Sequence, residues 1–401
     1  MSTTVSLKIE ATLEPALLRY DWKISRKSRV ITQPPTEILQ YQEHILLSVD
    51  NQQVTADYMT QTHTLNMHPD DSPTTLYVSE INVYWDGHPN SKDVFFDICT
   101  LKDIQNGNIH NDVVPGFKTS SAQMSLEKNY TVEIRISRPK RAFFCTSILS
   151  EEEYRRGKTH SNDPFDKREI ALQIKNRLVE PYPSQGDTSL CGPAVFYYCL
   201  LKDRPDIYDK AAKLLWTYGK VKIGDLEIKP GYDCRHPSRI DGISALDWLT
   251  LASLRDSSNT FRDYDEVSDQ VSGITLPGGL VDWFTKIGSI HIDKSTSLFF
   301  SRELVDLVKL SQHYTNNLHI VLFVAAKIID RGDSVNTKDH WVALADKIKV
   351  NNEEISIASP LDGVIDFNFF TWGTIRSFKY RTTLKYFLAH FYGGLAFKPI
   401  R

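Results

Sequence analysis

One cysteine in this sequence has neighbours that suit nucleophilic catalysis. Cys191 is followed directly by Gly192-Pro193, and Gln185 lies six residues before it. A thiol is a strong nucleophile only as its thiolate, and the N-terminus of a helix favours that anion. Pro193 suits the first turn of a helix, so we expect Cys191 at a helix start. Its backbone amide and the side chain of Gln185 could then donate to a developing oxyanion.

Such a thiol needs a histidine to accept its proton. Among twelve histidines, His340 stands out because it follows a polar stretch, 330–337, and opens the apolar run His340-Trp-Val-Ala-Leu344. A histidine at the mouth of a strand can face a cleft, take the thiol proton and return it to a leaving amine. His319, also at a predicted strand start, is the alternative, and His236 fits a loop better.

Each of these residues also has a purely structural explanation. Buried, unreactive cysteines are common, and His340 alone fits a half-buried strand position. The catalytic hypothesis therefore depends on the combination of Gln185, a helix start at Cys191 and a downstream histidine.

Together these segments resemble a known family. Gln185, Cys191-Gly192-Pro193-Ala194 and His340-Trp-Val-Ala-Leu344 are similar to the active-site motifs of the papain-like cysteine peptidase superfamily. The resemblance is closest to the bacteriocin-leader peptidase domains of ABC exporters and covers about residues 180–400. It implies a thiol enzyme that cleaves amide bonds and uses neither a cofactor nor a metal. The run 248–259, with 223–230 before it, also resembles uncharacterised bacterial proteins similar to toxin domains, including those delivered by type VI secretion.

The third member of the site departs from that pattern. Exporter-type enzymes carry Asp-Pro on the strand after the histidine strand, whereas this chain has Ser359-Pro360. Either Ser359 orients His340 or Asp362 does. We favour Asp362, because a carboxylate both fixes the tautomer and stabilises the imidazolium; a simple turn residue before Gly363 explains it equally well. Trp372 could shield the site from water or pack in the core.

The elements that must position these residues divide the chain into three parts. Residues 1–147 are expected to form a β-rich, sandwich-like domain, because polar and apolar residues alternate as in half-buried strands. Residues 148–183 form a charged connector with a short helix over 166–177, and 184–401 form the papain-like domain. The best examples of alternation are 79–85 and 131–136, and turn-forming residues occupy 70–73, 86–90 and 105–107.

The C-terminal part is predicted to be α+β, with helices first and an antiparallel sheet afterwards. The predicted helices cover 193–201, 205–218, 244–254, 279–287 and 302–313, and the predicted strands cover 318–326, 340–344 and 354–358. Arg255, Asp256 and Asn259 close one of these helices. They could line a substrate groove, but we favour helix capping.

Composition excludes several classes of protein. The 401 residues carry a net charge of −3, which gives no basic footprint for nucleic acid. No apolar run approaches the length of a membrane span. The five cysteines are widely spaced, without the pattern of a disulfide framework or a zinc site. The N-terminus shows no signal peptide, so we expect free thiols and a cytoplasmic protein in the producing cell, secreted into a target cell without a signal peptide.

The leading hypothesis is a cysteine protease acting on a protein or peptide as an antibacterial toxin or secreted effector. Its expected partners are the substrate, a cognate immunity protein and a component of the secretion apparatus. A Gln or Asn deamidase and a peptidoglycan amidase would use the same residues. A catalytically inactive papain-like binding protein, and an adhesion or delivery module centred on the β-rich half, remain the alternatives from other classes.

Overall fold

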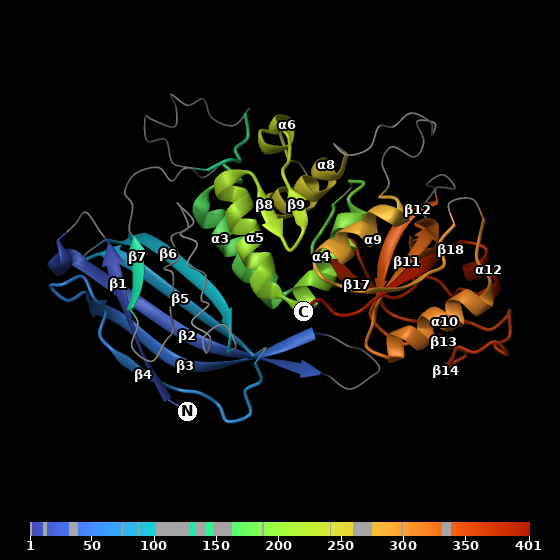
Figure 1. The fold of residues 1–401 in the computed structure, drawn as a ribbon, viewed down its shortest axis with the longest axis horizontal. Helices are drawn as coiled ribbons and strands as arrows, with labels where there is room; N and C mark the ends of the chain where they lie inside the picture. Colours follow the sequence, from blue (N-terminus) through green and yellow to red (C-terminus); the bar gives the residue numbers. More distant parts are fainter. Residues whose placement is uncertain are drawn as a thin grey trace.

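The α+β class is confirmed by the structure, a computed structural model in which helices lie between two groups of strands (Figure 1). It describes residues 2–10, 14–31, 39–73, 75–86, 88–101, 129–133, 141–146, 163–186, 188–240, 242–259, 275–297, 300–330 and 338–401. The predicted turn at 105–107, the polar stretch 331–337 and residues 148–162 of the charged connector lie outside these ranges.

The first group of strands forms two sheets. Its elements are β1 (Ser2–Glu10), a 3-10 turn (Pro15–Leu17), β2 (Leu18–Ile31), β3 (Leu39–Gln53), β4 (His63–Asn66), β5 (Leu76–Trp85), β6 (His88–Thr100) and β7 (Asn129–Glu133). An antiparallel sheet has the order β3-β2-β5-β6, and a smaller sheet has the order β4-β1-β7. Apolar side chains from both sheets, such as Trp22 and Leu65, share one core. The strands predicted around 79–85 and 131–136 correspond to β5 and β7.

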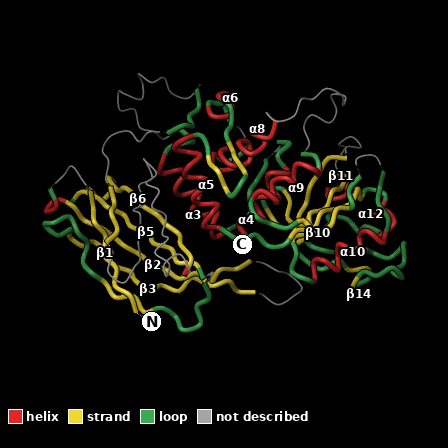
Figure 2. The backbone as a smooth tube through the Cα atoms, in the orientation of Figure 1, coloured by secondary structure: helices red, strands yellow, loops and turns green. Residues whose placement is uncertain are grey.

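In the described part of the chain, helices form most of the segment between the two groups of strands, and three more lie among the strands of the second group (Figure 2). They are α3 (Lys167–Val179), α4 (Cys191–Asp203), α5 (Pro205–Tyr218), α6 (Tyr232–Arg235), α7 (Ala245–Asp247), a π-helical turn (Trp248–Ala252), α8 (Ser253–Asn259), α9 (Pro277–Lys286), α10 (Leu304–Thr315), α11 (Lys327–Asp330) and α12 (Leu384–Leu388). A small hairpin, β8 (Val221–Ile223) and β9 (Leu226–Ile228), follows α5. Helix α4 is buried on every side from Cys191 to Leu201, which makes it the central helix.

The second group of strands forms a six-stranded antiparallel sheet. Its order is β10-β18-β11-β12-β16-β17, from β10 (His291–Lys294), β18 (Phe391–Phe397), β11 (His319–Ala325), β12 (Lys338–Leu344), β16 (Phe369–Thr371) and β17 (Thr374–Arg376). A small sheet joins β13 (Lys349–Val350), β14 (Glu353–Glu354) and β15 (Ile365–Asp366). One face of the large sheet packs against α4, where Tyr198 and Phe370 stack with centroids 4.2 Å apart. The other face shares a core with α10.

One predicted strand is wrong. The sequence favoured a strand over 354–358, but β14 ends at Glu354 and a turn follows. Ser356 and Ser359 explain the difference, because the Ser359 hydroxyl accepts the Ser356 amide at 2.9 Å and the Ser359 amide bonds the Ser356 carbonyl. Local bonds of this kind compete with strand pairing.

The connector helix belongs to the same core as the central helix. Ile170, Ile174 and Leu178 form the buried face predicted for it, and they pack in one cluster with residues of α4 and α5. Leu76 and Val78 of β5 join the same cluster. Apolar contacts therefore run without a break from the first sheet to the central helix.

Candidate active site

Cys191 is the first residue of α4, as predicted. Its exposed fraction is 3%, and Leu190 before it provides no side-chain cap for the helix. Helix geometry leaves the first backbone amides without partners inside the helix, and they carry partial positive charge. The thiol is thus attached at the end of the helix where an anion is favoured.

The loop before Cys191 is closed by two residues that bond to each other. Gln185 donates from Nε2 to the Thr188 carbonyl at 2.7 Å, and the Thr188 hydroxyl donates to the Gln185 carbonyl at 2.6 Å. Gln185 is 6% exposed. Glycine at position 186 lets this loop pack closely against Gly242. The φ of Gly186 is +56°, and a Cβ there would lie 2.2 Å from the Gly242 carbonyl oxygen. The Gln185 amide keeps a second N–H that the Thr188 bond does not use.

Gly192 makes a close contact with Thr275 at the start of α4. A Cβ at Gly192 would lie 2.2 Å from Thr275 Oγ1, so glycine is required here for packing rather than for substrate access. The Thr275 carbonyl in turn accepts the Trp341 ring N–H at 2.8 Å. These contacts bring the start of α4 next to β12, one residue from His340.

His340 lies within β12, where its ring is held by two neighbours. Nε2 is 2.6 Å from the Thr371 hydroxyl, and the ring stacks on Trp372 with centroids 4.8 Å apart. Burial lowers the pKa of His340 to about 4, so the imidazole is neutral at physiological pH. If Nε2 donates to the Thr371 hydroxyl, Nδ1 is the nitrogen that can accept a proton; if the hydroxyl donates to Nε2, the ring proton lies on Nδ1.

Trp372 adopts an unusual backbone conformation to reach that ring. Its φ is +44° and that of Gly373 is +73°, which together form the tight turn between β16 and β17. A bulky residue at positive φ costs of order 1 kcal/mol, and Asn or Gly would fill the turn without strain. The Arg376 guanidinium lies 5.1 Å from the Trp372 ring. The ring contact with His340 favours the shielding role over simple core packing.

Helix α4, which begins at Cys191, packs against β12, but His340 pairs with Val324 and faces the side of the sheet opposite α4. Successive strand residues face opposite sides, and β12 directs Trp341 toward α4 while His340 meets Thr371 and Trp372. Catalytic hydrogen bonds are often long or misaligned without substrate. Direct contact between the thiol and the imidazole stays a prediction, and it requires the His340 ring to turn toward the α4 face of the sheet.

Neither residue proposed to orient His340 contacts it. Ser359 is used in its own turn with Ser356. Asp362 is exposed in the turn between Pro360 and Gly363, whereas His340 is 4% exposed. The expectation that Asp362 orients the ring is not supported, because the strand beside β12 in the sheet is β16.

Thr371, which sequence reasoning missed, occupies the place expected of the orienting residue. The sequence signal that could have found it is the hairpin Thr371-Trp-Gly-Thr374. Its turn, Trp372-Gly373, places Thr371 at the end of a short strand.

A cleft of about 770 Å³ opens beside the start of α4. Its lining residues are Thr146, Thr188, Ser189, Leu190, Asp233, Cys234, His236, Pro237, Ser238, Arg239, Trp248, Ala252, Arg255 and Asp256. Leu190, the residue before Cys191, is part of this lining, whereas Cys191, Gln185 and His340 are not. Arg255 and Asp256 line it, and Asp256 also accepts the Gly231 amide at 2.6 Å. The bond from Asp256 to Gly231 agrees with the preferred role in satisfying nearby backbone, and a role in binding substrate stays a prediction; the Asn259 side chain lies outside the described residues.

His319, the alternative base, belongs to a separate buried cluster. Its Nε2 is 2.5 Å from Asp203 Oδ2 at the end of α4. Burial alone would lower the pKa of His319, but Cys199 and Asp203 outweigh it and raise the pKa to about 10. Cys199 is fully buried. This group lies about two helical turns from Cys191 and holds a charged histidine rather than a base.

Across the residues that the structure describes, no group of three or more His, Cys, Asp or Glu is arranged to hold a metal ion. No helix in the same part of the chain has the length and apolarity of a membrane span. No protein-family model, curated protein or solved structure matches this chain.

Proposed function

We propose that this protein is a thiol-dependent amide hydrolase of the papain-like type, with Cys191 as nucleophile and a protein or peptide as substrate. The observation that carries the proposal is the position of Cys191. It begins a buried helix, ends the loop closed by Gln185, and adjoins a cleft large enough for several residues of a peptide. The resemblance of its motifs to papain-like peptidases supports the same conclusion.

The proposed reaction uses His340 as a general base and then as a general acid. Cys191 Sγ attacks the substrate carbonyl carbon while His340 Nδ1 takes the thiol proton. The carbonyl oxygen becomes an oxyanion, bound by the Cys191 amide and the second N–H of Gln185. Collapse expels the amine with the proton from His340 and leaves a thioester. Water then attacks the thioester, His340 accepts its proton, and the acid departs as the proton returns to the thiol.

The environment of His340 determines which form of this mechanism applies. A neighbouring carboxylate would stabilise an imidazolium before substrate binds, but here the polar neighbour is the neutral hydroxyl of Thr371. The lowered pKa of His340 favours a neutral imidazole in the resting enzyme. Proton transfer would then accompany the attack rather than precede it.

Selective alkylation tests the nucleophile. We expect iodoacetamide at limiting concentration and pH 7 to modify Cys191 faster than the other cysteines, as measured by mass spectrometry of tryptic peptides. Burial raises the pKa of Cys145 to about 11 and that of Cys234 to about 12, so these thiols should react slowly. His340→Gln should slow the labelling of Cys191. Equal or slower labelling of Cys191 relative to Cys145 would refute its assignment.

The class of amide bond is tested in cells. Wild type and Cys191→Ala are expressed in a bacterial host, and the two proteomes are compared. Protein fragments that depend on Cys191 would indicate proteolysis, deamidated Gln or Asn would indicate a deamidase, and released wall peptides would indicate an amidase. We propose proteolysis, delivered as an antibacterial effector, so growth inhibition should depend on Cys191 and be relieved by an immunity protein.

A second candidate is a papain-like protein that binds without catalysis. Two observations on the described residues favour it: the polar neighbour of His340 is the Thr371 hydroxyl rather than a carboxylate, and His340 faces the side of the sheet opposite α4. That protein would show no preferential alkylation of Cys191 and no product in either assay.

A further inference from the structure

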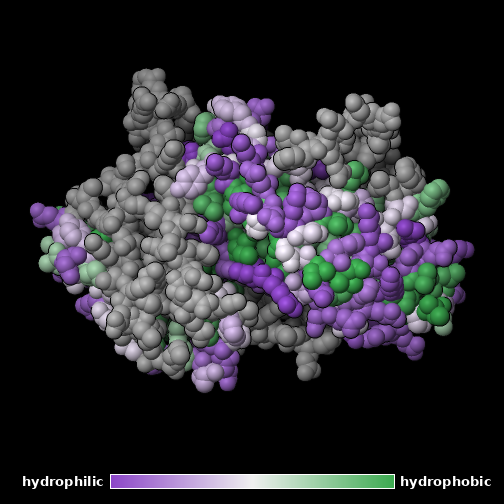
Figure 3. All heavy atoms as spheres, viewed as in Figure 1, coloured by the Kyte–Doolittle hydropathy of each residue, from purple (hydrophilic) through white to green (hydrophobic). Residues whose placement is uncertain are grey.

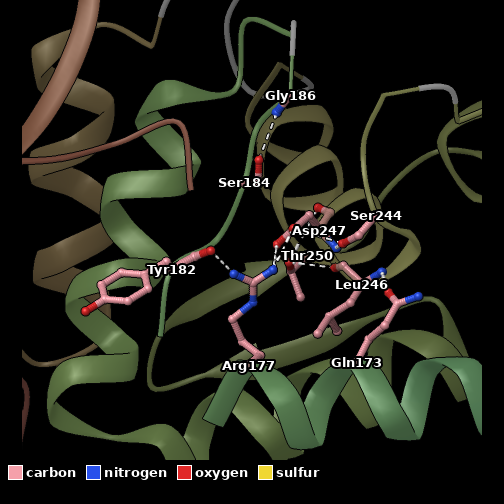
Figure 4. A network of polar contacts seen from close by, with 9 residues as sticks. All are labelled: Gln173, Arg177, Tyr182, Ser184, Gly186, Ser244, Leu246, Asp247 and Thr250. Carbon is pink, nitrogen blue, oxygen red and sulfur yellow. Dashed lines mark hydrogen bonds and ion pairs between the residues drawn. The ribbon is translucent and has the colours of Figure 1, made fainter. Parts of the chain in front are cut away.

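The connector helix α3 contacts the segment that carries Gln185 through a buried ion pair (Figure 4). Arg177 Nη2 donates to both carboxylate oxygens of Asp247, at 2.8 and 2.6 Å, and Nη1 donates to the Tyr182 carbonyl. The side chains of Arg177 and Asp247 are 12% and 1% exposed. A single guanidinium thus joins α3, the helical turn α7 and the chain just before Gln185.

Asp247 holds the same segment from a second point. Its carboxylate accepts the backbone amide of Ser184 and, at 2.8 Å, the hydroxyl of Ser244. The ion pair therefore fixes a carbonyl at 182 and an amide at 184, on the two sides of Pro183. The next side chain is that of Gln185.

The opposite side of this segment packs against the turn that carries Trp372. A Cβ at Gly373 would lie 2.7 Å from the Ser184 side chain. Ser184 is thus confined between the ion pair and the hairpin whose tryptophan stacks on His340. Its hydroxyl also accepts the Gly186 amide at 3.4 Å.

We propose that Arg177 and Asp247 are positioning residues for Gln185, so that α3 is part of the catalytic unit. The inference rests on the proposed thiol hydrolase. A buried, bidentate pair is rigid, and it holds backbone groups rather than another flexible side chain. Removing it would leave Cys191 on its helix but would release Gln185 from the place where it can donate to the oxyanion.

Two reactions of the same thiol separate this role from general structural support. Acylation by p-nitrophenyl acetate forms an oxyanion and needs its donors, whereas alkylation by iodoacetamide is a displacement that forms none. We expect Gln185→Ala to lower the acylation rate about 100-fold, as loss of an oxyanion donor does, and to leave alkylation of Cys191 unchanged. Arg177→Met should lower acylation about tenfold or more with the same selectivity.

A double-mutant cycle shows whether Arg177 acts through Gln185. In a Gln185→Ala background, Arg177→Met should cause little further loss of acylation, because the donor that it positions is already absent. Arg177→Lys should recover part of the rate, since Lys keeps the charge but has no fork to bond both partners. Lys175→Met is the matched control. Lys175 is a cation on the same helix, paired with Glu80 at 2.7 Å and remote from the loop, so both reactions should be unchanged.

An unpaired buried Asp247 could unfold the Arg177→Met protein, so Arg177→Met/Asp247→Leu is made as well, which leaves no uncompensated charge. Its fold is checked by circular dichroism. Equal loss of acylation and alkylation, or a full additional loss on top of Gln185→Ala, would overturn the positioning role. If wild type acylates no faster than Cys191→Ala, the proposed hydrolase itself fails instead.

Discussion

His340 and Thr371 are joined across neighbouring strands by a 2.6 Å hydrogen bond between Nε2 and Oγ1. A hydroxyl can accept the Nε2 proton and so fix the tautomer that keeps Nδ1 available. It supplies no charge to stabilise an imidazolium. The orienting contact is therefore weaker than that of a carboxylate. Most of the transition-state stabilisation would then come from the oxyanion donors.

Thr371→Val should lower turnover about fivefold, because it removes one hydrogen bond worth about 1 kcal/mol and keeps the side-chain shape. Thr371→Asp should move the acid limb of the pH–rate profile upward from near pH 4, since a carboxylate favours the charged imidazole and raises the pKa of His340. The measurement is p-nitrophenyl acetate hydrolysis from pH 3.5 to 8. An acid limb that stays in place in Thr371→Asp would contradict the role of this contact.

Asp362→Asn and Ser359→Ala should each change turnover less than twofold, within the range of surface substitutions. Asp362 is exposed in its turn, and the Ser359 hydroxyl is used by the Ser356 amide. Both variants are compared with wild type in the same ester assay. A large loss in Asp362→Asn would restore the carboxylate as the orienting group and would require a rearrangement of the 360–363 turn.

These outcomes show how far the sequence predicts the site. Local signals were sufficient for Cys191, because Gly-Pro after a thiol specifies a helix start within a few residues. The stripe of Ile170, Ile174 and Leu178 predicted α3 in the same way. The partner of His340 was beyond local signals, since it depends on which strand lies beside β12. After β12 the chain first forms the small sheet of β13, β14 and β15, and only then does β16 pair with β12. No spacing in the sequence predicts this order.

The same limit applies to Arg177. Its charge in a charged connector is typical of a solvated helix face, and only the folded chain brings Asp247 to it, 70 residues later. Domain boundaries drawn from composition separated α3 from the catalytic part for that reason.

His319→Gln should destabilise the protein by about 3 kcal/mol at pH 6, because it leaves Asp203 buried without its cation. The folded-state pKa of His319, about 10, lies above its usual value. The stabilisation is therefore complete below about pH 6.5 and is lost as pH rises toward 10. Urea unfolding of wild type and variant at pH 6, 8 and 10 measures it. A difference in unfolding free energy that grows with pH would contradict the charged pair.

Removal of residues before 184 should prevent the C-terminal part from folding, although the motifs for catalysis all lie beyond that point. The cut removes Ile170, Ile174 and Leu178, which are 0%, 0% and 3% exposed, and each contributes about 1.5–3 kcal/mol of burial. It also leaves Asp247 without Arg177. These losses are comparable with the whole stability of a domain, about 5–15 kcal/mol.

A fragment of residues 163–401, which keeps α3, should be more stable than 184–401. It should still be less stable than the full chain, because it exposes the surface covered by Leu76 and Val78. Expression yield, circular dichroism and thermal unfolding of the full chain, 163–401 and 184–401 rank the three. If 184–401 melts as cooperatively as the full chain, α3 is dispensable for the fold, and the boundary drawn from composition is the physical one.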